Sequence, residues 1–246
     1  RAPNRDAFME MVTAGQPPAP SYFVYDAILN RKNRELLDEE ALPAAMTLDE
    51  ADRAVAAGAL LVDGRTPEEF ALGHLEGAIN VGLGGRYAEF AGSIIPSDAD
   101  IVLFVEDGYE LEAKNRLARI GFDRVIGAVS ETTRVLVENP DRVRRASRLT
   151  SEAFNGRHAE VENIQIVDVR NPGEVESGMI PDAVNIPVGQ IPARLGELDA
   201  SRPTVIYCAG GYRSSVAASL LRQNGFGDVS DILGGYGAWS ETTQSA

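Results

Sequence analysis

The feature that most limits how this chain can fold is an internal repeat. Residues 61–69 match residues 166–174, and residues 73–80 match residues 178–185. Every matched pair is separated by 105 positions. A constant spacing over such a stretch indicates two successive copies of one structural unit.

The later part of each copy also aligns, and it indicates the fold class. Residues 101–110 lie opposite residues 204–213, with the offset shortened to 103 positions. In both copies short apolar strands alternate with helical stretches, which is typical of an α/β domain with a mainly parallel sheet flanked by helices. The first copy is predicted to occupy residues 47–140 and the second residues 145–246.

The chain before the first copy has a different character. Residues 1–46 show no clear periodic pattern of apolar residues, and residues 17–20 are a stiff, proline-rich stretch. We expect residues 1–46 to be an arm or linker that wraps the surface. Directly after it, Thr47 and Glu50 fit a capping box at the start of a helix. Residues 59–63 are predicted to form a buried strand.

Composition argues against several classes of function. The net charge of −14 disfavours nucleic acid and anionic membranes as partners, and no apolar run approaches the roughly 18 residues of a membrane span. Two histidines, His74 and His158, cannot form a three-histidine metal site, and no pair of CxxC motifs is present, so we expect no metal and no cofactor. A single cysteine excludes an internal disulfide and indicates a thiol kept reduced, as in the cytoplasm.

That cysteine, Cys208, follows a β-branched run and precedes a glycine loop and a helix-like stretch. The N–H groups of the loop and the positive end of the helix macrodipole converge there, which favours a bound anion and the nucleophilic thiolate. Arg213 can hold an anionic group in a forked hydrogen-bond geometry. Cys208 is therefore the predicted catalytic residue. The predicted substrate-binding residues are Ala209, Gly210, Gly211, Tyr212 and Arg213.

The first copy lacks this chemistry. At the position of Cys208 it has Val105, and at the position of Arg213 it has Glu110. Asp107 stands opposite Gly210, so acids replace the expected anion cradle. We expect the first copy to keep the fold without the activity and to have a structural role.

The second copy resembles a rhodanese domain, of the thiosulfate sulfurtransferase family. The resemblance rests on residues 167–174, residues 178–187, the loop at 208–214 and the stretch at 233–239, which together span the second copy. The first copy resembles a degenerate rhodanese domain. The resemblance implies two rhodanese-like domains and a persulfide mechanism, in which the cysteine accepts a sulfane sulfur from a donor and passes it to a nucleophilic acceptor.

A narrower resemblance covers residues 11–130. Residues 13–16, 22–23, 26–27 and 30–31 are similar to the segment that joins a metallo-β-lactamase-like domain to tandem rhodanese domains, as in persulfide dioxygenase-like fusions. This implies that the chain is a piece of such a fusion, with a metallo-β-lactamase-like domain upstream. The alternative is a rhodanese pair that stands alone.

The expected function is that of a sulfurtransferase, which moves a sulfane sulfur from thiosulfate or a persulfide donor to a thiol or cyanide acceptor. Loop length separates it from the main enzymatic alternative, because cysteine phosphatases place five residues between cysteine and arginine, and four separate Cys208 from Arg213. A cysteine-dependent phosphatase or arsenate reductase-like enzyme stays that alternative. The non-enzymatic alternative is a sulfur-carrying or scaffolding module that holds a persulfide without rapid turnover.

Other residues are interpreted as structural. Asp168 and Arg170, at a strand end, recur in the first copy as Asp63 and Arg65, which favours charge pairing over catalysis. His74 has no counterpart in the second copy and is expected to be a packed or surface residue. We also expect Tyr236 and Trp239 to close the core, and Ser214 and Ser215 to cap the helix after the loop.

Overall fold

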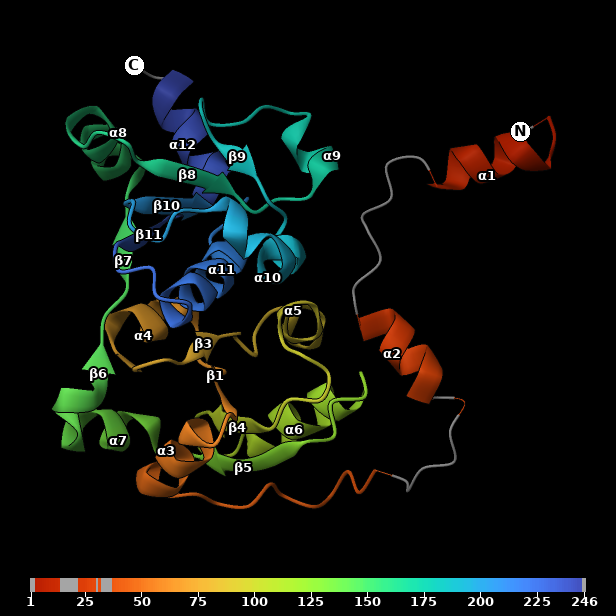
Figure 1. The fold of residues 1–246 in the computed structure, drawn as a ribbon, viewed down its shortest axis with the longest axis vertical. Helices are drawn as coiled ribbons and strands as arrows, with labels where there is room; N and C mark the ends of the chain where they lie inside the picture. The colour runs from red at the N-terminus through yellow and green to blue at the C-terminus, as the bar shows by residue number, and fades with distance from the viewer. Residues whose placement is uncertain (1–2, 14–21, 30, 32–36, 245–246) are drawn as a thin grey trace.

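The protein is seen here as a computed structural model that describes residues 3–13, 22–29, 31 and 37–244. Two α/β units lie one above the other in Figure 1, and the two helices of the N-terminal arm lie to their side. Each unit is built on a parallel sheet with helices packed against it. The α/β class predicted from the alternation of strands and helices is confirmed.

A four-stranded parallel sheet in the order β3-β1-β4-β5 forms the centre of the first unit. Its central strands are apolar and almost fully buried, as expected of a parallel sheet covered on both faces. The elements are α3 (Leu48–Ala56), β1 (Leu60–Asp63), α4 (Pro67–Leu72), β3 (Ile79–Asn80), α5 (Tyr87–Ile94), β4 (Ile101–Phe104), α6 (Glu110–Ala118), β5 (Val125–Val129), α7 (Thr132–Glu138) and the 3-10 turn η1 (Pro140–Arg142).

A five-stranded parallel sheet in the order β7-β11-β10-β8-β9 forms the centre of the second unit. The short antiparallel pair of β2 (His74–Leu75) and β6 (Val143–Arg144) ties the connecting segment to the first unit. The elements of the second unit are β7 (Ser147–Leu149), α8 (Ser151–Glu160), β8 (Gln165–Asp168), α9 (Pro172–Val175), β9 (Val184–Asn185), η2 (Val188–Gln190), α10 (Ile191–Arg194), η3 (Leu195–Glu197), β10 (Thr204–Tyr207), α11 (Tyr212–Gln223), β11 (Val229–Ile232) and α12 (Gly235–Gln244).

The predicted capping box at the start of α3 is confirmed. The Glu50 N–H donates to Thr47 Oγ1 at 3.3 Å, and the Thr47 N–H donates to Glu50 Oε2 at 2.8 Å. The same device starts α4 in the first unit, with Glu69 as its acid, and α9 in the second, with Glu174. These two boxes occupy matching places in the repeat, so the copies share local signals as well as strands.

Helix α11 joins the two units through a common core. Its residues 214–221 are all buried, because the helix lies between the sheet of the second unit and β3 of the first (Figure 1). One apolar cluster contains residues of both units, among them Ile79 and Leu221. Polar contacts reinforce this packing: Ser215 Oγ donates to Asn80 Oδ1 at 2.7 Å, and the Asn80 N–H donates to Ser219 Oγ at 2.9 Å.

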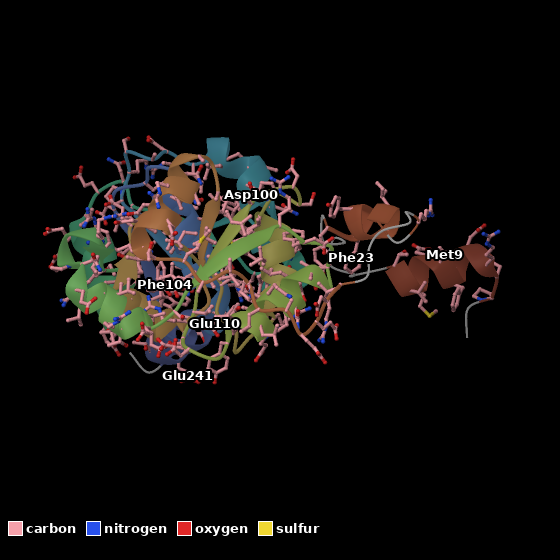
Figure 2. The ribbon with its side chains drawn as sticks, turned by 90° about the horizontal axis from the view of Figure 1, so that it is seen from below. Met9, Phe23, Asp100, Phe104, Glu110 and Glu241 are labelled. Carbon is pink, nitrogen blue, oxygen red and sulfur yellow. The ribbon has the colours of Figure 1, made fainter. Side chains whose placement is uncertain are left out.

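The N-terminal arm contains two helices that the sequence pattern did not predict, α1 (Arg5–Thr13) and α2 (Tyr22–Leu29). Helix α1 has no buried residue, so it lacks the core-facing stripe by which a helix is recognised. Figure 2 shows Met9 and Phe23 on these helices, beside the main body. Residues 38–46 do follow the surface of the first unit, where the Met46 N–H donates to the Ala128 carbonyl at 2.8 Å.

Some features singled out in the sequence lie outside the described residues. They are the proline-rich stretch at 17–20 and parts of the segment resembling a fusion joint, at 14–16 and at 30. Among the helices of the described ranges, none has both the length and the apolar character needed to span a bilayer.

Candidate active site

Cys208 lies directly after β10, at the carboxyl end of a central parallel strand, where ligands of open α/β sheets commonly bind. The loop turns at Gly211, whose φ of +101° is a left-handed conformation that glycine adopts without strain. Helix α11 begins at the next residue. The predicted arrangement of strand, glycine loop and helix start is therefore present.

The sulfur of Cys208 is buried and contacts the backbone of its own loop. The Gly211 N–H donates to Cys208 Sγ at 3.0 Å, and Ser214 Oγ lies 3.7 Å from the same sulfur. Ala209 and Gly210 are exposed. The helix start and this N–H donor both favour negative charge on the sulfur or on a group attached to it.

The guanidinium of Arg213 is already engaged. Its Nη1 and Nη2 donate to both carboxylate oxygens of Glu174, at 2.6 and 2.7 Å. The hydrogen bond to Glu174 raises the pKa of Arg213, and burial opposes that rise. The nearby Cys208 raises this pKa further. In return Arg213 lowers the pKa of Glu174. Any anion that bound Arg213 here would share it with a carboxylate, which the sequence did not anticipate.

Tyr212, also predicted to bind substrate, points its side chain into the first unit. Its hydroxyl donates to the Gly82 carbonyl at 2.5 Å, and its ring packs against Phe90. A Cβ at Gly85 would lie only 2.7 Å from the Tyr212 ring carbon Cζ, so the close approach requires a glycine. What Tyr212 can offer a ligand is its backbone, while its side chain anchors the loop to the neighbouring unit.

A buried ion pair supports the loop from the other side. Arg148 donates to the Asp231 carboxylate at 3.2 Å, and its Nη2 also lies 3.4 Å from the Gly211 carbonyl oxygen. Burial raises the pKa of Asp231, and Arg148 opposes that rise. Arg148 Nη1 reaches Glu68 of the first unit at 2.7 Å. Both units thus contribute to the position of the loop.

The interpretation of Ser214 and Ser215 as helix caps is wrong. The N-cap of α11 is Gly211, which has no side-chain cap. Ser214 Oγ lies 3.1 Å from both Asp231 Oδ2 and the Gly211 carbonyl oxygen, and one hydroxyl proton can serve only one of them at a time. Ser215 donates to Asn80 instead. Ser215 bonds a residue 135 positions away, and Ser214 contacts Asp231, 17 positions away, which local pattern does not reveal.

The residues that follow β11 contact the backbone of the loop at 208–213. The Tyr236 N–H donates to the Cys208 carbonyl at 2.8 Å. A side chain at Gly235, which has a φ of +59°, would collide with that same carbonyl. Tyr236 and Trp239 pack against the apolar cluster around Tyr207, so the prediction that they close the core is confirmed.

In the equivalent loop of the first unit, a side chain of the loop itself accepts the backbone N–H. Gly108, the counterpart of Gly211, also has a positive φ, of +88°. Its N–H donates at 2.8 Å to Glu110 Oε2, whereas the Gly211 N–H donates to sulfur. Glu110 is among the labelled residues of Figure 2. A carboxylate therefore takes the backbone donor that the second unit gives to its thiol.

The charge pairs expected from the repeat are present in both units. Arg65 binds Asp63 and donates to the Gly73 carbonyl at 2.9 Å; Arg170 binds Asp168 and donates to the Gly178 carbonyl at 2.7 Å. The two arrangements differ little, although one unit has the cysteine and the other does not.

His74 is a packed residue, which is one of the two alternatives expected from the sequence. It stacks on Phe70 with ring centroids 3.8 Å apart. Burial lowers its pKa to about 4, so the ring is neutral at neutral pH. No cluster of three or more metal-ligating side chains is found among the residues described.

A comparison with models of protein families agrees with this architecture. A family model described as a rhodanese-like domain matches residues 47–129 and again residues 154–242. A sulfurtransferase from Allochromatium vinosum is 42% identical over 94 residues, covering 38% of this chain and 88% of that protein. Thiosulfate sulfurtransferase GlpE from Shewanella oneidensis is 37% identical over 82 residues, covering 33% and 81%. The crystal structure of a rhodanese-like domain protein from Staphylococcus aureus is 35% identical, covers 38% of this chain and 90% of that one, and gives a TM-score of 0.36.

Proposed function

Because this chain belongs to the rhodanese-like domain family, with two such domains in succession, we propose that it is a sulfurtransferase with Cys208 as its nucleophile. The observation that carries the proposal is the hydrogen bond from the Gly211 N–H to Cys208 Sγ at 3.0 Å, at the start of α11. A donor of this kind is in place before the reaction and needs no reorganisation when charge develops on sulfur.

The reaction proceeds as two displacements. The Cys208 thiolate attacks the outer sulfur of thiosulfate and forms a new S–S bond with it. The S–S bond of thiosulfate breaks, and its electron pair leaves with sulfite. The persulfide carries the negative charge on its outer sulfur. A thiolate or cyanide acceptor then attacks that sulfur and releases the Cys208 thiolate, so ping-pong kinetics follow. A glutathione persulfide or polysulfide as donor would release a thiolate or a shorter polysulfide instead of sulfite.

Intact-mass spectrometry tests the proposal directly. Incubation with thiosulfate should add the mass of one sulfur atom, and subsequent cyanide or thiol should remove it with release of product. Sulfur that is gained but turned over negligibly would favour the carrier module. Rapid hydrolysis of p-nitrophenyl phosphate, with no added sulfur, would favour the phosphatase and contradict sulfur transfer.

Glu174 should weaken the binding of anionic donors, because its carboxylate shares Arg213 with them. Replacing Glu174 with Gln removes the charge and keeps a side chain that can complete the capping box. We expect the KM for thiosulfate to fall about fivefold, equivalent to ~1 kcal/mol for a partly exposed ion pair. Glu69→Gln is the matched control, since it alters the same box in the first unit. A KM that is unchanged in Glu174→Gln, or lowered equally in both variants, would contradict this role.

We also propose a cellular location and partners for this protein. A lone thiol that must stay reduced suits a reducing cytoplasm, and the partners we propose are a small sulfur donor and a thiol or cyanide acceptor, without nucleic acid or membrane. We propose the upstream metallo-β-lactamase-like domain on the sequence similarity of residues 11–130 alone.

A further inference from the structure

A cleft of about 400 Å³ lies at the junction of the two units, away from the cysteine loop. It is lined by the β2 turn of the first unit, the connecting segment at 144–147, the last turn of α11 and the turn that leads into β11. None of residues 208–213 lines it. Arg222, in its lining, is ten residues beyond the start of α11, or about 15 Å along the helix axis.

The cleft is cationic in a chain of strongly negative charge. Three arginines line it, Arg144, Arg145 and Arg222, together with the two carboxylates Glu76 and Asp228. Both carboxylates are already paired: Glu76 with Arg144 at 2.6 Å and Asp228 with Arg157, outside the lining, at 2.6 Å. Positive charge in the lining therefore exceeds what its own acids neutralise.

Two of these arginines have no carboxylate in direct contact. Within the part of the chain that the structure describes, no carboxylate lies within 4.0 Å of Arg145 or Arg222. Arg222 is half-buried and donates to the Val229 carbonyl at 2.8 Å, a neutral partner. Burial lowers the pKa of Arg222, and the carboxylate of Asp231 opposes this only in part, so holding the cation away from water still has a cost. A bound anion would offset that cost.

The rest of the lining suits a ligand that has hydroxyl and apolar groups as well as charge. His74 Nδ1 lies 2.9 Å from the Phe70 carbonyl oxygen, to which it donates, so the other ring nitrogen of the neutral imidazole is an acceptor for a hydroxyl. Ala78 and Phe226 add apolar surface. The volume exceeds that of a bare inorganic ion. Charge, acceptor and size together match a small organic phosphate.

We propose that this cleft binds a small phosphate-bearing molecule, with its phosphate on Arg145 and Arg222. Guanidinium groups are well suited to phosphate, because their N–H donors match its oxygens in pairs. The ligand would contact both units and the segment that connects them. The site is separate from sulfur transfer, and its test needs no sulfur-transfer activity.

Titration calorimetry on the full chain tests the proposal with three probes. Pyrophosphate supplies charge alone, ribose 5-phosphate supplies charge and hydroxyls, and ribose is the uncharged counterpart. We expect saturable binding of both phosphates with one site per chain, tighter for ribose 5-phosphate, and no binding of ribose. Absence of saturable binding of both phosphates at millimolar concentration would overturn the proposal, as would equal binding of ribose.

Two charge-reversal variants distinguish binding in this cleft from a general effect of net charge on phosphate binding. Arg145→Glu should weaken binding of ribose 5-phosphate by about tenfold or more, since it removes a charged hydrogen bond and adds repulsion. Arg134→Glu changes the net charge equally on exposed α7 and should leave binding unchanged. Because Arg145 is exposed, circular dichroism should show both variants folded. Equal weakening in the two variants would show that no specific site exists.

Discussion

Replacing Cys208 with serine is expected to abolish sulfur transfer from thiosulfate, with kcat reduced on the order of 10³-fold or more. The hydroxyl is far less nucleophilic than a thiolate, and no other cysteine can take its place. Serine is close in size and can still accept the Gly211 N–H, so the loop should keep its conformation. The measurement is steady-state transfer to cyanide, together with the unfolding midpoint as a check on the fold. Activity that survives the change would contradict the mechanism.

A thiol in the first unit provides the matched control. In the double variant Cys208→Ser with Val105→Cys, a thiol stands at the equivalent position, after β4. We expect this variant to remain inactive, because Glu110 occupies the Gly108 N–H that would serve the sulfur. Recovery of transfer would show that a thiol at a strand end suffices and that the donors of the loop at 208–213 contribute little.

Replacing Arg148 with methionine is expected to destabilise the protein by about 3–5 kcal/mol, the range for removing one partner of a buried ion pair. Asp231, which is 3% exposed, would be left as a carboxylate without its partner. The loss should also displace the Gly211 carbonyl and lower kcat, since Arg148 contacts both groups. Urea unfolding and steady-state kinetics measure the two effects.

Two further variants and the pH dependence identify the cause. Adding Asp231→Asn to Arg148→Met should restore much of the stability, because neither charge of the pair remains. Glu68→Gln should cost less than ~1 kcal/mol, since Glu68 is 68% exposed. Burial raises the pKa of Asp231, and loss of Arg148 removes the largest of the effects that oppose that rise. A raised pKa in the folded state stabilises at low pH and the effect is lost as pH rises, so the deficit of Arg148→Met should grow with pH. A deficit that is constant with pH would contradict the assignment.

The sequence was most informative where a local pattern decides structure. The strand before Cys208 is β-branched, and only a glycine suits the left-handed turn at Gly211, so strand, turn and helix could be predicted from neighbouring residues. The repeat then predicted two α/β units, because the same strand and loop signals recur. The capping box at Thr47 and Glu50 was predicted for the same reason: both partners lie within one helical turn.

What the sequence did not reveal depends on contacts between distant residues. Arg148 and Asp231 are 83 positions apart, and Glu174 and Arg213 are 39 apart. Nothing in the neighbourhood of either residue specifies its partner, because strand order and loop packing bring them together. The two arm helices were missed for a different reason. Helix α1 buries none of its residues, so the pattern that marks a helix packed on a core is absent.

The packing of α11 has a consequence for how this duplicated chain persists. A copy without the cysteine is ordinarily free to decay or to be deleted over generations. Here deletion would leave the face of α11 that meets Ile79 in water and Ser215 without Asn80. Natural selection for a stable second copy would therefore also preserve the first. The first copy forms the other half of a shared interior, so its packing surface is constrained even where its loop residues differ from those of the second.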